Sequence, residues 1–129
     1  MIVIDIAEIR GTERDVSTDQ WTSLRLLLKQ DQMGFSMHVT TIPAGEALEM
    51  QYRNHKEAVY CVDGVGSLHD LDTDTVYPIK PGVLYALDSH ERHILKATTQ
   101  LTTVCVFNPP LIGREKHDSS GSYPILETD

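Results

Sequence analysis

The chain has 129 residues, of which 40% are hydrophobic and 23% charged, and its formal net charge is −8. This length predicts a single domain over residues 1–129, large enough to bury a core without staples. An acidic chain is a poor partner for a polyanion, and no apolar run approaches the ~20 residues that span a bilayer, so we expect neither nucleic acid nor a membrane as a partner.

Two cysteines, Cys61 and Cys105, each lie in an apolar stretch typical of a strand. They could form at most one bridge, and the N-terminus lacks the basic and apolar segments of a signal peptide. We therefore expect two buried free thiols in a reducing compartment, which predicts a cytoplasmic protein.

The first segment with a readable pattern covers residues 17–29, and it is ambiguous. Ser17 and Asp19 could open a helix, but the run from Trp21 to Leu28 also fits a strand. Four later segments, 35–42, 57–62, 83–87 and 101–107, alternate as half-buried strands do. The residues that share a face are Phe35, Met37 and Val39 (opposite Ser36, His38 and Thr40), then Glu57, Val59 and Cys61, then Val83, Tyr85 and Leu87, and finally Thr103, Cys105 and Phe107.

Turn signals separate these segments at Asp63-Gly64, Pro81-Gly82 and the run 108–110. Many short strands at this spacing predict an all-β fold, an antiparallel barrel or jelly roll with a few short helical segments. We expect the polar tail, residues 119–129, to be flexible.

Two glycine-containing motifs, which we call the glycine frames, overlap the predicted strands. They read Gly45-x5-Gln51-x-Arg53-x3-Glu57-x6-Gly64 and Gly82-x5-Asp88-x-His90-x2-His93. The spacings resemble the two motifs of the cupin superfamily, small β-barrels that usually bind a metal through three His and one Glu. Here Gln51 and Arg53 replace two of the histidines, so the resemblance implies a cupin barrel with an altered metal site.

Glu57, Tyr85 and His93 are the candidate metal ligands. Glu57 shares a face with Val59 and should point inward, where a lone carboxylate must be paired, protonated or metal-bound. Tyr85 lies between inward-facing residues, and His93 falls on the histidine of the second frame. A carboxylate, a phenolate and an imidazole suit iron, with zinc or another divalent metal as the alternative.

Each ligand also has a structural interpretation. Glu57 could instead form an ion pair with Arg53 or Lys56, and most buried tyrosines, Tyr85 included, are core residues with a hydrogen-bonded hydroxyl. Arg53 cannot ligate a metal, because it remains protonated. The sequence alone leaves these alternatives open.

Nearly the whole chain, from Met1 to about Tyr123, resembles the ectoine synthase family. The most specific run is Phe107-Asn-Pro-Pro-x-x-Gly-Arg-Glu-x-His-Asp118, supported by residues 11–16, 25–29, 34–36, 52–61, 77–82 and 84–88. The resemblance implies a cytoplasmic, dimeric, iron-dependent cupin, a carbon–oxygen lyase of compatible-solute biosynthesis. Such an enzyme closes the small molecule N-γ-acetyl-L-2,4-diaminobutyrate into ectoine with loss of water, a reaction of the osmotic stress response.

The resemblance also assigns residues. The family's iron ligands fall on Glu57, Tyr85 and His93. Its substrate-binding positions fall on Trp21, Arg25, Thr40, Tyr52, Cys105, Phe107, Glu115 and His117.

The reaction needs an acid–base pair, for which Tyr52 and the Glu115-x-His117 pair are the catalytic candidates. Arg25 could bind the substrate carboxylate in a bidentate manner. We interpret Cys105 as a pocket wall, because no histidine is locally spaced to activate it. The structural alternatives are a solvated loop for Glu115 and His117 and core packing for the aromatic residues.

Two departures from the family pattern, Gln51 and the stretch Ala47-Leu-Glu-Met50, bear on substrate preference. They leave open a related metal-dependent cupin enzyme that acts on another N-acyl diamino acid or hydrolyses ectoine. A non-catalytic cupin that binds a small solute is a third reading, although a pure binder needs no acid–base pair.

Overall fold

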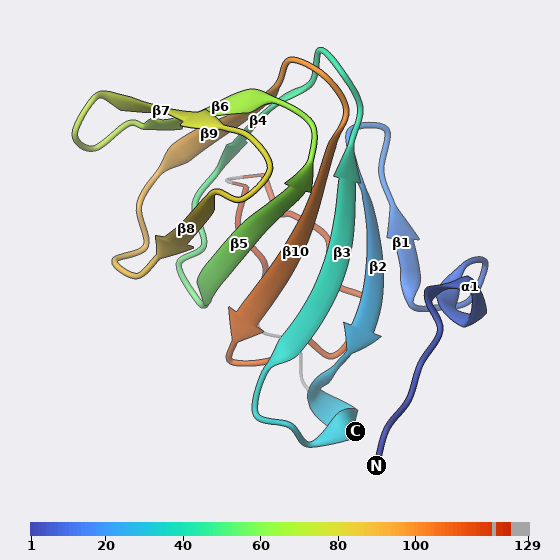
Figure 1. Ribbon diagram of the computed structural model, residues 1–129. Helices are drawn as coiled ribbons and strands as arrows, with labels where there is room; N and C mark the ends of the chain where they lie inside the picture. The colour runs from blue at the N-terminus through green and yellow to red at the C-terminus, as the bar shows by residue number, and fades with distance from the viewer. Residues whose placement is uncertain (120, 125–129) are drawn as a thin grey trace.

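A computed structural model describes residues 1–119 and 121–124 of the chain. In this part of the chain, ten strands form two antiparallel sheets that face each other as a barrel (Figure 1). The strands are β1 (Asp15–Ser17), β2 (Thr22–Leu27), β3 (Ser36–Ile42), β4 (Ala47–Met50), β5 (Lys56–Asp63), β6 (Gly66–Asp70), β7 (Thr75–Ile79), β8 (Leu84–Leu87), β9 (His93–Ala97) and β10 (Leu101–Asn108).

The larger sheet has the order β1-β2-β3-β10-β5-β8, and the smaller sheet has the order β4-β9-β6-β7. The described helices are short: α1 (Ile6–Ile9), begun by an Asp5 side chain that accepts from the Ala7 amide, and the 3-10 turn η1 (Lys29–Asp31). The predicted all-β antiparallel fold with short helical segments is therefore confirmed. No helix in the described part of the chain is long and apolar enough to cross a membrane.

The ambiguous segment 17–29 is mainly a strand. Residues 22–27 pair with β1 on one side and with β3 on the other, so tertiary pairing decides what the local pattern left open. The Asp63-Gly64 turn follows β5 as predicted. Gly64 has φ +92°, and a Cβ there would lie 2.1 Å from the Gln100 carbonyl oxygen, so only glycine fits.

The core lies between the sheets, where the inward residues of β5 and β10 are buried as their alternation predicted. Strand β3 is different. Its inward face carries Ser36, His38 and Thr40, whereas Met37 and Val39 lie on the outer face and are half-buried. The polar face of this strand points into the barrel, which is the first sign of an internal site.

The segment after β10 closes one side of the barrel between β2 and β4. It begins beside β2, where the Lys29 amide donates to the Leu111 carbonyl (2.8 Å), and ends beside β4, where the Gln51 amide donates to the Gly121 carbonyl (3.1 Å). Ser122 and Tyr123 are buried there, so this part of the predicted tail packs against the barrel. Residues 120 and 125–129 of that predicted tail lie outside the described part of the chain.

Candidate active site

The barrel encloses a central cavity of about 30 Å³, lined by both sheets and by the C-terminal segment. This is roughly the space of one water molecule. Most of the site residues predicted from the sequence line it: Trp21, Thr40, Tyr52, Glu57, Tyr85, Cys105, Phe107 and His117. Arg25, Glu115 and His93 lie outside the lining. Arg25 lies beside Tyr123 and His93 lies beside Tyr52 and Tyr85, whereas Glu115 approaches Arg25.

Tyr52 and His117, two of the predicted catalytic residues, form a close hydrogen-bonded pair at the cavity. The Tyr52 hydroxyl lies 2.7 Å from His117 Nε2 and 3.3 Å from Met50 Sδ. Burial and the nearby Arg25 charge lower the pKa of His117 to about 4, while burial and the charge of Glu57 raise the pKa of Tyr52 well above its usual value. Both groups are therefore neutral near pH 7, and the pair can accept one proton and return it.

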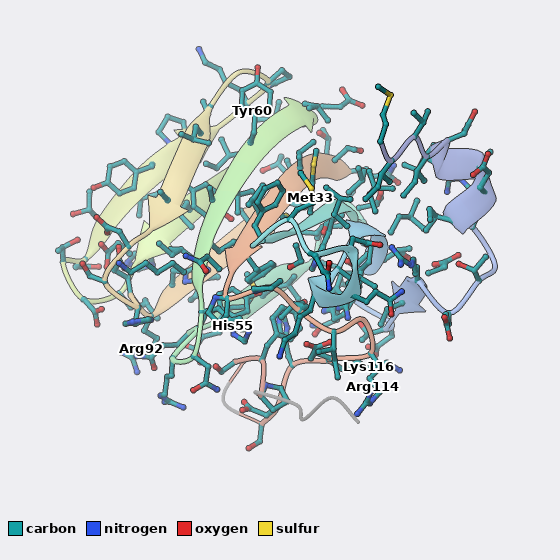
Figure 2. The ribbon with its side chains drawn as sticks, turned by 90° about the horizontal axis from the view of Figure 1, so that it is seen from below. Met33, His55, Tyr60, Arg92, Arg114 and Lys116 are labelled. Atoms are coloured by element: carbon teal, nitrogen blue, oxygen red, sulfur yellow. The ribbon has the colours of Figure 1, made fainter. Side chains whose placement is uncertain are left out.

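Glu115 and His117 project inward from an extended segment because alternate residues of such a segment point the same way. Arg114, which precedes Glu115, and Lys116, which lies between Glu115 and His117, are exposed and point outward (Figure 2). The Glu115 carboxylate accepts the amides of Ile112 (2.7 Å) and Gly113 (2.8 Å). The solvated loop considered as an alternative for Glu115 is thus wrong, since this side chain is buried and held by its own turn.

Arg25 is a fully buried cation with spare donors. Its Nε donates to Ser23 Oγ (3.3 Å), and its Nη1 lies 3.8 Å from Glu115 Oε1. Among the described residues, neither Nη1 nor Nη2 has a hydrogen-bond partner. Unpaired buried donors are costly, so this guanidinium is suited to an anionic ligand such as a carboxylate.

The three predicted metal ligands come from both sheets. Glu57 of β5 and Tyr85 of β8 line the cavity, and β5 and β8 are hydrogen-bonded neighbours. The His93 ring of β9 is centred 6.5 Å from the Tyr85 ring. Tyr85 and His93 also line a second cavity of about 340 Å³ on their far side, next to β6 and β7.

His93 is prepared to ligate through one nitrogen. Its Nδ1 lies 3.0 Å from the Glu91 carbonyl oxygen, which can only accept, so Nδ1 carries the hydrogen. Nε2 is then left with a lone pair, and among the described residues it has no partner. A buried imidazole held in this tautomer is typical of a metal ligand.

The electrostatics of Glu57 also fit a cation. Burial raises the pKa of its carboxyl to about 8 and the pKa of the Tyr85 hydroxyl well above its usual value. Lys56, one of the two predicted ion-pair partners, is exposed on the opposite face of β5. A divalent ion would stabilise the ionised forms of these two buried acids, so Glu57, Tyr85 and His93 are chemically suited to hold a divalent metal ion. No three His, Cys, Asp or Glu side chains of the described residues gather at one point, so the set depends on the Tyr85 phenol.

Cys105 behaves as the pocket wall that we expected. Its Sγ lies 3.3 Å from Thr103 Oγ1 and 3.6 Å from Thr40 Oγ1. Burial raises its pKa to about 12, so the thiol is protonated and a poor nucleophile. Cys61 is likewise a buried free thiol, as the sequence predicted.

Gln51, Arg53 and His90, three further residues of the two glycine frames, form hydrogen bonds outside the central cavity. Gln51 Nε2 donates to the His90 carbonyl (3.2 Å), and His90 Nδ1 lies 2.7 Å from the Tyr52 carbonyl oxygen. Arg53 Nη2 donates to Gln51 Oε1 (3.1 Å). None of these three side chains lines the central cavity, so the loss of the cupin histidines leaves its chemistry to other residues.

Two ring-bearing residues at this site, His38 and Tyr123, are not among those predicted from the sequence. His38 is 1% exposed, pairs in register with Arg25, and has a buried Nε2 without a partner in the described part of the chain. Its alternation with Thr40 was visible, but nothing local indicated that this face points inward. Tyr123 stacks on Tyr52 (ring centroids 5.1 Å apart), and the Arg25 Cζ lies 5.6 Å from its ring centroid. The polar composition around Tyr123 gave no signal.

Comparison with known proteins gives consistent results. The family model for ectoine synthase matches residues 1–127. L-ectoine synthase of Sphingopyxis alaskensis is 55% identical over 96% of this chain and 90% of its own, and that of Desulfosudis oleivorans is 56% identical over 98% and 99%. The crystal structure of ectoine synthase from P. lautus has a TM-score of 0.88 at 50% identity, covering 100% of this chain and 93% of that one.

Proposed function

The chain belongs to the ectoine synthase family, and from this premise we propose that it closes N-γ-acetyl-L-2,4-diaminobutyrate into L-ectoine with loss of water. It is an enzyme, a carbon–oxygen lyase of the hydro-lyase type. The observation that carries the proposed reaction is the Tyr52–His117 pair beside a buried carboxylate, phenol and imidazole.

Substrate binding begins with charge. The substrate carries a carboxylate and an amine, and the spare donors of buried Arg25 suit the carboxylate. Tyr123 lies over Arg25, and a cavity of about 30 Å³ is too small for this substrate. The segment that carries His117 and Tyr123 must therefore move outward to admit the substrate and return to exclude water.

The chemistry is one ring closure and one dehydration. The α-amine nitrogen attacks the acetyl carbonyl carbon, so the new C–N bond forms as the carbonyl π bond breaks, and the Tyr52–His117 pair moves one amine proton to the carbonyl oxygen to give a carbinolamine. The pair then takes a second proton from the ring nitrogen and gives it to the hydroxyl, the C–O bond breaks, and water leaves as the ring C=N bond forms. Trp21 and Phe107 keep bulk water, which favours the open amide, away from this step.

We propose Fe²⁺ as the cofactor, with zinc or another divalent ion as the alternative, held by Glu57, Tyr85 and His93. When bound, the ion supplies Lewis acidity to an otherwise unreactive amide carbonyl. The tautomer of His93 and the burial of the Glu57 carboxyl, whose pKa burial raises to about 8, support this assignment.

We further propose a cytoplasmic homodimer that makes a compatible solute under osmotic stress. Support for a dimer comes from Tyr60 and Leu84, which lie opposite each other on the outer face and are 44% and 62% exposed. Figure 2 shows Tyr60 on the outside of β5. Strand β8 ends its sheet in the described part of the chain, and such edges readily pair. Light scattering should give twice the chain mass, and Leu84→Glu should lower it.

The test of function is direct. The iron-loaded protein is incubated anaerobically with N-γ-acetyl-L-2,4-diaminobutyrate, and ectoine is followed by chromatography. The reverse reaction, hydrolysis of ectoine, is measured in a parallel incubation that starts from ectoine. Formation of ectoine supports the proposal, whereas an iron-replete protein that makes none would contradict it, and net hydrolysis alone would favour the alternative.

A further inference from the structure

The stretch 47–50, which departs from the family pattern, contributes to the central cavity. Strand β4 alternates so that Ala47 and Glu49 are exposed, whereas Leu48 and Met50 are 6% and 5% exposed. Both inward side chains line the cavity. Gln51, the other departure, does not, so any effect on substrate preference from this part of the chain comes through Leu48 and Met50.

These two side chains lie at different depths. Met50 is at the catalytic level, because its Sδ lies 3.3 Å from the Tyr52 hydroxyl. Leu48 lies two residues further along the same face of β4, which is about 6.6 Å. It lies opposite Leu95 of β9, and Leu95 and Ile42 also line the cavity. Because Ile42 lies four residues along β3 from His38, the register partner of Arg25, the cavity has an apolar end away from Arg25.

The proposed substrate has a matching polarity. Its carboxylate and amine are charged and its amide is polar, so its acetyl methyl is the apolar group that needs a dry contact. If the carboxylate binds Arg25 and the carbonyl oxygen faces the ion proposed at Glu57 and Tyr85, the acetyl methyl would lie toward the apolar end formed by Leu48 and Leu95. We propose that Leu48, backed by Leu95 and Ile42, is a specificity-determining residue that restricts the N-acyl group to acetyl. This inference rests on the proposed function.

The expected size of the effect follows from apolar pockets in general. One methylene in such a pocket changes kcat/KM by about 10- to 200-fold. We therefore expect wild type to prefer the N-γ-acetyl over the N-γ-propionyl substrate by at least about 10-fold. Leu48→Ala removes three carbons beside the acyl methyl and should shift that ratio toward propionyl by a similar factor.

A matched control is available in the same row of the sheet. Leu68 of β6 pairs with Leu95 on its other side, is also 6% exposed, and does not line the central cavity. Leu68→Ala should lower the melting temperature as Leu48→Ala does, but leave the acetyl-to-propionyl ratio at the wild-type value. Leu48→Phe is the opposite change, and it should turn over the N-γ-formyl substrate better than the acetyl one.

The experiment measures kcat/KM for the formyl, acetyl and propionyl substrates with the iron-loaded wild type and these three variants. A ratio shifted toward propionyl in Leu48→Ala, with Leu68→Ala unchanged, supports the inference. If Leu48→Ala does not fold, Leu48→Phe tests the inference instead: a preference for the formyl over the acetyl substrate supports it, and an unchanged preference contradicts it. Wild type that converts acetyl while the Leu48 variants keep its ratios overturns this inference alone. Wild type that converts no acyl substrate overturns the proposed function and this inference with it.

Discussion

The hydroxyl of Tyr52 and Nε2 of His117 lie 2.7 Å apart although the two residues are 65 positions apart in the chain. Tyr52 follows β4, and His117 belongs to the segment that closes the barrel. The hydrogen bond therefore exists only when that segment is in place. The acid–base pair that we propose would therefore form only when this segment covers the cavity.

Removing either member of this pair should abolish proton transfer without unfolding the barrel. We expect Tyr52→Phe and His117→Gln each to lower kcat by about 10²- to 10⁴-fold, the usual contribution of a positioned acid–base group. Steady-state kinetics with circular dichroism as a fold check would measure it. Tyr60→Phe, on the exposed outer face, is the control and should be fully active. A Tyr52→Phe enzyme within threefold of wild type would contradict the role of the hydroxyl.

Glu57 should make the metal-free protein less stable as the pH rises. Its folded pKa, raised by burial to about 8, lies above the ordinary carboxyl pKa of 4.5. The carboxyl is therefore protonated in the folded state below pH 8. Its contribution to the free energy of unfolding is fully present below pH 4.5 and is lost as the pH rises from 4.5 to 8. The shift corresponds to at most about 5 kcal/mol.

Denaturant unfolding of metal-free wild type and Glu57→Gln at pH 5 and pH 9 would measure this. We expect the free energy of unfolding of Glu57→Gln, relative to that of wild type, to be larger at pH 9 than at pH 5. Glu49→Gln, on the exposed face of β4, should show no such difference. Equal pH dependence in wild type and Glu57→Gln would mean that the carboxyl is already ionised and paired.

Tyr85→Phe separates ligation from packing. The ring is kept, so the barrel should remain folded, but the phenol oxygen is lost. We expect bound iron, measured by elemental analysis, to fall several-fold together with activity, as in Glu57→Ala and His93→Ala. Tyr77→Phe on the exposed part of β7 should keep its iron. Full iron content in Tyr85→Phe would show that the phenol is not a ligand.

Movement of the C-terminal segment should be visible in the fluorescence of Trp21, the single tryptophan of the chain. Its ring is centred 5.4 Å from His117, and the His117 ring is centred 4.5 Å from Tyr123. Substrate that enters beneath this segment should change the emission in two steps, opening and closing. We expect Tyr123→Ala to raise KM and to abolish the slower step in stopped-flow records. Substrate binding seen by calorimetry without any change in emission would contradict the closure.

Much of the fold could be predicted because alternation is a local signal. The inward residues of β5 and β10 followed from period two, and Gly64 followed from its turn. The segment now known as β2 could not be assigned, since its apolar run fits helix and strand equally well. Its pairing with β3 decided it, and that pairing joins residues that are distant in the sequence.

By itself, the sequence determined an all-β barrel, the two buried thiols and a set of candidate residues with the right chemistry. Only the tertiary structure decided which face of β3 points inward, because burial depends on the opposite sheet and not on the polarity of the strand. It also decided that Ser122 and Tyr123 belong to the interior. A short polar segment carries no periodicity, so its contact with Tyr52 and Arg25 arises only when the barrel presents a surface to cover.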